Sequence, residues 1–125
     1  MPNAVVHFEI IGSHPESLRS FYNRLFGWEY DLSGKVSDTV SEPENYGFIS
    51  PLSDIGVAGG VGGGEAFSPQ TLFYVGVENV EEALALAEQL GGNRIIGPTS
   101  NPAGTLVIGR FKDPEGNLIG VAGNE

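Results

Sequence analysis

The pentapeptide IGVAG, residues 55–59, occurs a second time at residues 119–123, so the chain repeats itself at an offset of 64. An offset of 65 aligns the residues before each copy, and places the apolar run 6–10 on residues 71–75. A repeat of this kind indicates that one supersecondary unit is used twice. We therefore expect one domain, residues 1–125, with repeats at about 3–60 and about 70–123.

Apolar side chains recur at helical spacing in both halves, at positions that correspond under the 65-residue offset. The first set is Leu18, Phe21, Tyr22 and Leu25, and the second is Ala83, Leu86, Ala87 and Leu90. Their spacing of i, i+3, i+4 and i+7 places each set on one face of a helix. We therefore predict helices over about 15–26 and 80–90, each packing its apolar face on a sheet.

The two predicted helices have matching ends. Residue pairs suited to an N-terminal capping box stand at their starts, Ser13 with Glu16 and Asn79 with Glu82. Glycines that favour a left-handed C-cap follow them, Gly27 and Gly92.

Short apolar segments flank each helix and predict strands. In the first half they lie near 5–11, 28–32, 46–50 and 55–60, and in the second near 72–77, 94–96, 105–111 and 118–122. The fold class is thus α+β: two βαβββ modules, expected to form an open cup-shaped mixed sheet with the helices outside. Residues 60–70 are predicted to be a flexible linker. The glycine-rich run 59–64 has no lysine and opens no helix, so we interpret it as a mobile edge or flap instead of a phosphate loop.

Composition excludes several functions. The net charge of −10 opposes binding to nucleic acid and to anionic membranes, since both carry negative charge. Without cysteine there is neither a disulfide nor thiolate chemistry. No basic segment leads into an apolar stretch at the start of the chain, and we expect a cytoplasmic protein.

Two motifs connect the chain to a known family. FYNRLFGWE stands at residues 21–29 and DPEGN at 113–117, with His7 on the first predicted strand. Together with the internal repeat they resemble the glyoxalase/bleomycin-resistance/extradiol-dioxygenase (vicinal oxygen chelate) superfamily, over essentially the whole chain. The resemblance implies a two-module cup, a homodimer and a small-molecule ligand. In metal-dependent members it also implies four metal ligands, on the first and last strand of each module.

Three of these four ligand positions lack a suitable side chain. His7 matches, but its counterpart 65 residues on is Leu72, and the last-strand positions are Gly120 and, by the 64-residue offset, Gly56. Catalytic metal sites need about three protein ligands. We therefore expect no cofactor, with a weakly held divalent ion at His7 as the alternative.

Strand alternation leaves polar groups on the predicted cup floor. His7 and Glu9 share a face, and the repeat places Tyr74 at the position of Glu9. A carboxylate beside an imidazole and a phenol suits proton transfer. An equal interpretation is that His7 is a remnant of the family's metal site and is hydrogen-bonded to Glu9. Arg110 follows an apolar strand and is interpreted as a partner for Glu9 or a ligand carboxylate, or as a surface ion-pair residue.

Two functions remain open at this point. The first is a metal-independent protein that binds a small organic ligand, as the bleomycin-resistance branch does. Its predicted site comprises His7, Glu9, Phe48, Gly56, Leu72, Tyr74, Arg110 and Gly120. The second is a lyase, isomerase or dioxygenase-like enzyme with a rebuilt site of His7, Glu9 and Tyr74. Tyr46 and Phe48 are available to line a pocket, whereas Trp28 and Phe73 are expected in the core.

Overall fold

The computed structural model describes residues 2–102 and 104–125, and the fold is α+β. The chain divides into two compact units, one of His7–Thr71 and one of Leu72–Glu125 with the residues up to Val6. Among the described residues, no helix is both long enough and apolar enough to span a membrane.

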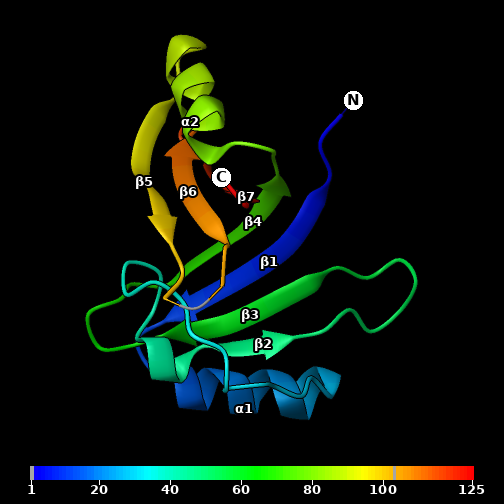
Figure 1. Ribbon diagram of the computed structural model, residues 1–125. Coiled ribbons are helices and arrows are strands. Elements are labelled where there is room, and N and C mark those ends of the chain that lie inside the picture. The colour runs from blue at the N-terminus through cyan, green and yellow to red at the C-terminus, as the bar shows by residue number, and fades with distance from the viewer. Residues whose placement is uncertain (1, 103) are drawn as a thin grey trace. The chain divides into compact units, whose positions relative to one another are not determined.

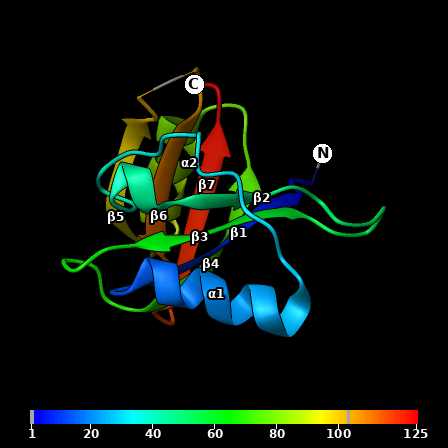
Figure 2. The same ribbon diagram turned by 90° about the horizontal axis from the view of Figure 1, so that it is seen from below.

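The first unit contains one helix and a small mixed sheet (Figure 1). Its elements in chain order are β1 (Val5–Gly12), α1 (Pro15–Phe26), the 3-10 helix η1 (Pro43–Asn45), β2 (Gly47–Ile49) and β3 (Ala58–Gly63). The sheet order is β2-β3-β1, with β1 parallel and β2 antiparallel to β3. Helix α1 packs against β3, and Figure 2 shows it running alongside these strands.

The second unit repeats this arrangement. Its elements are β4 (Gln70–Gly76), α2 (Val80–Gln89), β5 (Asn93–Ser100), β6 (Val107–Lys112) and β7 (Leu118–Gly123). The order is β4-β7-β6-β5, with β4 parallel to β7 and antiparallel pairs elsewhere. In the first unit a single bridge from Asp31 to Phe48 takes the place of β5. The predicted strand at 28–32 is thus reduced to one bridge, and the two-module prediction is confirmed.

The predictions of a linker beginning at Gly60 and of a flap over 59–64 are wrong. Residues 59–63 lie within β3, the central strand of the three, and they are buried. Glycine is needed here for space, because large side chains lie directly on the strand. A Cβ at Gly59 would lie 2.1 Å from the Phe8 ring, and one at Gly60 would lie 2.1 Å from Tyr46. The glycine-rich composition indicated a flexible segment. In the structure these glycines instead leave the space that neighbouring side chains occupy.

The helix ends follow the sequence in part. Pro15 takes the first helical position of α1, so His14 is the N-cap residue and Ser13 lies too early to cap; its hydroxyl bonds His14 Nδ1 at 3.1 Å instead. Gly27 is left-handed with φ 75°, as predicted. The prediction for Gly92 is wrong, because the positive φ (103°) falls on Gly91.

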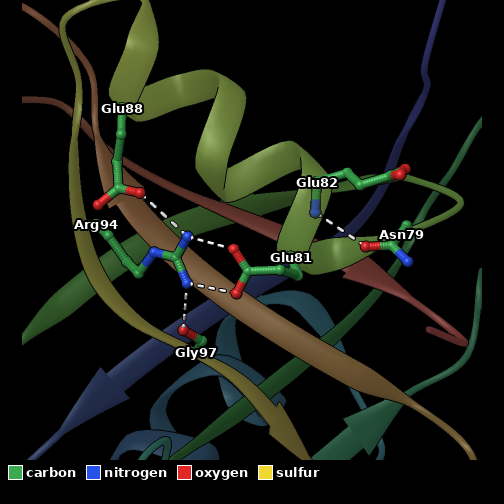
Figure 3. Close-up of polar contacts among 6 residues, drawn as sticks. All are labelled: Asn79, Glu81, Glu82, Glu88, Arg94 and Gly97. Atoms are coloured by element: carbon green, nitrogen blue, oxygen red, sulfur yellow. Dashed lines mark hydrogen bonds and ion pairs between the residues drawn. The ribbon is translucent and has the colours of Figure 1, made fainter.

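Helix α2 is capped and tied to its sheet by polar contacts (Figure 3). The Asn79 side chain accepts a 2.9 Å hydrogen bond from the backbone N–H of Glu82, as predicted. Arg94 of β5 forms ion pairs with Glu81 at 2.7 Å and with Glu88 at 3.1 Å. Hydrogen bonds from Arg94 lower the pKa of the Glu81 carboxyl.

The apolar helix faces are buried only in part. Val80 and Leu84 form the core of the second unit with Val121, and Gly109 allows this approach because a Cβ there would lie 2.6 Å from Leu84. The prediction that whole stripes pack on the sheets is wrong at four positions, which are more than half exposed. These are Phe21, Leu25, Leu86 and Leu90.

Candidate functional site

A buried chain of polar groups lies on the face of β1 opposite α1. Strand alternation puts His7 and Glu9 on this face, while Phe8 points to the helix side and contacts Trp28. Tyr46, just before β2, places its hydroxyl 2.8 Å from His7 Nε2 and donates to Glu9 Oε1 at 2.9 Å. Glu9 is 2% exposed and Tyr46 is 1% exposed. The Tyr46 hydroxyl thus joins His7 and Glu9, the two residues that strand alternation placed together.

Burial controls the charge of His7. Removal of the imidazole from water disfavours its cationic form and lowers its pKa to about 4. His7 is therefore neutral at neutral pH. The rings of Tyr46 and Phe48 lie 4.8 Å apart, and Phe48 also contacts His7 edge-on at 6.4 Å, so the polar chain has an apolar flank.

A glycine makes room for the Tyr46 ring. In the ladder Glu9 of β1 lies opposite Gly60 of β3, and Gly60 lies opposite Phe48 of β2. A Cβ at Gly60 would come within 2.1 Å of the Tyr46 hydroxyl oxygen. The ring therefore lies over a position where any other residue would project.

The second unit also has a tyrosine ring over a glycine, but this tyrosine comes from the first strand of its module and is bonded to an arginine. Tyr74 of β4 lies opposite Gly120 of β7, and Gly120 lies opposite Arg110 of β6. A Cβ at Gly120 would lie 2.3 Å from the Tyr74 ring. The Arg110 Nε–H donates to the Tyr74 hydroxyl at 3.1 Å, and Arg110 is 5% exposed. The interpretation of Arg110 as a surface ion-pair residue is wrong.

These registers correct the assignment of Gly56. The pair Glu9–Gly60 corresponds to Tyr74–Gly120, so the counterpart of Gly120 is Gly60, whereas Gly56 lies exposed in the loop before β3. The repeated pentapeptide misled the alignment, because residues 119–123 lie within β7 while 55–59 lie mostly in a loop. The true offset of these glycines is 60.

The structure brings together some of the predicted site residues. His7, Glu9 and Phe48 meet around Tyr46, and Tyr74 meets Arg110. Leu72 is buried on the same face of β4 as Tyr74. The convergence of His7 and Glu9 with Tyr74 stays a prediction.

Sequence reasoning missed two positions of the candidate site and placed one other residue wrongly. Tyr46 was predicted only as an aromatic lining residue, although its hydroxyl joins His7 to Glu9. Gly60 was assigned to a linker, and Phe73, expected in the core, is 40% exposed. No local feature of the sequence distinguishes Gly60 from its neighbouring glycines. The one available clue was that the run Ala58–Gly63 is long enough to form a buried strand.

The family comparison agrees with this fold. The Glyoxalase/Bleomycin resistance protein/Dioxygenase superfamily matches residues 4–121. The chain belongs to this superfamily. No curated protein matches the sequence at a significant level.

Solved structures with this superfamily fold include several methylmalonyl-CoA epimerases. One, in complex with methylmalonyl-CoA and NH4+, has a TM-score of 0.68 at 15% identity, covering 99% of this chain and 96% of that one. A variant of the Streptomyces coelicolor epimerase, in complex with 2-nitronate-propionyl-CoA, has a TM-score of 0.69 at 16% identity with the same coverages. The Mycobacterium tuberculosis epimerase has a TM-score of 0.65 at 12% identity, covering 97% and 87%. At these identities the likeness shows the fold alone.

The residues at the superfamily's metal positions do not fit a divalent ion. Leu72 has no lone pair, and Gly60 and Gly120 have no side chain. His7 Nε2 is hydrogen-bonded to Tyr46. The space over each glycine holds a tyrosine ring. Within residues 2–102 and 104–125, no three His, Cys, Asp or Glu side chains form a group able to hold a metal.

Proposed function

We propose that this superfamily member binds a small organic molecule without a metal ion, through the polar groups on the helix-free face of its second module. The observation that carries this proposal is the pair of tyrosines over glycines. Tyr46 lies over Gly60 and Tyr74 over Gly120, where metal-dependent relatives would carry ligands. Each tyrosine hydroxyl also holds a buried ionisable group, Glu9 in one module and Arg110 in the other.

The residue chemistry defines the ligand class. The Arg110 guanidinium and the Tyr74 hydroxyl suit an oxygen that accepts hydrogen bonds, such as a carboxylate or a carbonyl. Leu72, on the same face of β4 as Tyr74, supplies apolar surface. The proposed ligand is therefore an organic molecule with an apolar body and at least one acceptor oxygen.

The first test is elemental analysis of the purified protein after exhaustive dialysis. We expect less than about one-tenth of an equivalent of any transition metal, because a single imidazole is a poor site. A stoichiometric metal that disappears in His7→Ala would overturn the proposal.

The second test measures ligand binding directly. Small carboxylates and ketones with apolar bodies are screened by thermal shift in the presence of EDTA, and the best ligand is then titrated calorimetrically. Tyr74→Phe and Arg110→Gln are expected to weaken binding about tenfold or more, the worth of a charged hydrogen bond. Tyr30→Phe is the matched control, because its hydroxyl bonds the Arg19 carbonyl in the first unit, whereas Tyr74 and Arg110 belong to the second.

A second candidate function is proton transfer, as in an isomerase or lyase. The observation that favours it is the hydrogen-bonded chain of His7, Tyr46 and Glu9, which can hold and move a proton. The epimerase names of the fold relatives suggest a probe, methylmalonyl-CoA incubated with the protein in D2O. Deuterium incorporation next to the thioester carbonyl that is lost in Glu9→Gln supports an enzyme. Its absence supports binding alone.

A further inference from the structure

We infer that a groove on the helix side of the second module binds a small organic cation that has an apolar body and an ammonium group at one end. The groove has a volume of about 450 Å³, and the residues that line it all belong to the second unit. Cavities that hold small molecules are of this size. The site is additional to the function proposed above, which uses the helix-free face of the same module, and it does not depend on that function.

Strand alternation separates the two faces of this sheet. Tyr74, Arg110 and Gly120 share the helix-free face, so the residue after each of them points to the helix side. These following residues line the groove and are Val75, Phe111 and Val121. The opposite wall is the apolar stripe of α2, which consists of Ala83, Leu86, Ala87 and Leu90.

Part of this apolar lining is left in water. Leu86 is 53% exposed and Leu90 is 72% exposed. An apolar body that lies between α2 and the sheet would cover both side chains, and the removal of apolar surface from water favours binding.

One end of the groove carries negative charge. Asp113 and Leu90 both line it, and the turn after β6 lies beside the end of α2, because a Cβ at Gly91 would lie 3.7 Å from Pro114 Cγ. Hydrogen bonds from the Asn117 side chain and from backbone N–H groups lower the pKa of the Asp113 carboxyl, so this group is ionised at neutral pH.

The end of α2 adds to this charge. The carbonyl end of a helix carries about half a negative charge. Helix α1 has Arg24 in its last turn, whereas the last turn of α2, which is fully described, contains no basic residue. Among the described residues that line the groove, none is a lysine or an arginine. An ammonium group at this end is therefore attracted by a carboxylate and by a helix terminus together.

Amide NMR titrations of the ¹⁵N-labelled protein with hexylammonium, hexanol and hexanoate test the inference at pH 7 and low ionic strength. The three probes share an apolar body and differ in charge. We expect hexylammonium to shift the amides of residues 83–92 and 111–113 and to bind about threefold more tightly than hexanol, with hexanoate weakest. Equal affinity for hexylammonium and hexanol, or shifts spread over the acidic residues of both units, would overturn the inference.

Matched variants test the two parts of the groove. Asp113→Asn keeps the Oδ1 acceptor of its turn and should reduce the preference for the cation at least about twofold. Asp54→Asn loses the same charge in an exposed loop of the first unit and should leave the preference unchanged. If both variants have the same effect, the groove does not select the cation and the inference fails.

The apolar wall is tested in the same way. Leu90→Gln should weaken hexylammonium and hexanol alike, whereas Leu25→Gln, at the corresponding position of α1, should weaken neither. If the groove amides shift with protein concentration when no probe is present, a second copy of the chain covers the groove and the inference is wrong. Dimerisation through α1 would leave these amides unchanged and is compatible with it.

Discussion

A methyl group at Gly60 is expected to be one of the most damaging small substitutions in the chain. The Cβ of Gly60→Ala would lie 2.1 Å from the ring and hydroxyl atoms of Tyr46, well inside van der Waals contact. The ring has little freedom to move, because its hydroxyl is bonded to both His7 and Glu9. The added methyl group therefore strains the backbone of β3 and breaks these two hydrogen bonds.

The magnitude follows from these two costs. Overpacking a core costs about 1–3 kcal/mol, and each lost hydrogen bond costs about 1 kcal/mol. The loss of unfolded-state entropy on replacing glycine by alanine returns about 0.4–1 kcal/mol. Overpacking together with both lost hydrogen bonds, less this entropy return, should lower the free energy of unfolding by about 2–4.5 kcal/mol, a large part of the about 5–15 kcal/mol of a typical domain.

Urea unfolding followed by circular dichroism measures this loss. The free energy of unfolding of a small protein falls by about 1–3 kcal/mol for each molar of urea, so the urea concentration at the midpoint should fall by roughly 1 M or more. Gly56→Ala is the matched control, because its new Cβ meets nothing closer than 3.3 Å and its φ is not positive. Its free energy of unfolding should stay within about 0.5 kcal/mol of wild type or rise slightly.

A double variant isolates the contact itself. Without the ring, in Tyr46→Ala, adding Gly60→Ala should cost less than about 1 kcal/mol. If Gly60→Ala costs no more than Gly56→Ala in the wild-type background, the packing of Tyr46 over Gly60 is refuted.

Three further outcomes are expected. Asn79→Ala should lose about 1 kcal/mol in urea unfolding because it removes the cap of α2, whereas Ser13→Ala, which caps nothing among the described residues, should change little. Because the folded pKa of His7 is about 4 against an ordinary 6.5, the unfolded chain binds more protons between these values. Stability should be constant above pH 6.5 and fall toward pH 4 by on the order of 3 kcal/mol from this group, and the fall should be smaller in His7→Gln. The apolar residues exposed on α1 and α2 predict a homodimer, and sedimentation at micromolar concentration that shows only a 13.2 kDa species would contradict it.

Local sequence features determined the modules and their helices. The helical spacing of apolar residues located α1 within its observed bounds, Pro15–Phe26, and α2 to within one residue. The repeat and the two family motifs predicted the superfamily, which the match over residues 4–121 confirms. These predictions succeeded because helix periodicity, caps and turns depend on residues close together in the chain.

Tertiary structure alone decided the details of the site. The residues that define it come from β1, the segment before β2 and β3 in the first unit, and from β4, β6 and β7 in the second. Their positions follow from strand register. Sequence identity aligned Gly56 with Gly120, whereas the ladder aligns Gly60, because a pentapeptide can repeat in sequence without occupying the same place in a strand. Nothing in the sequence around Tyr46 indicated that its hydroxyl would form buried hydrogen bonds. Its role follows from the missing side chain at Gly60, which lets its ring lie on the sheet and its hydroxyl reach both His7 and Glu9.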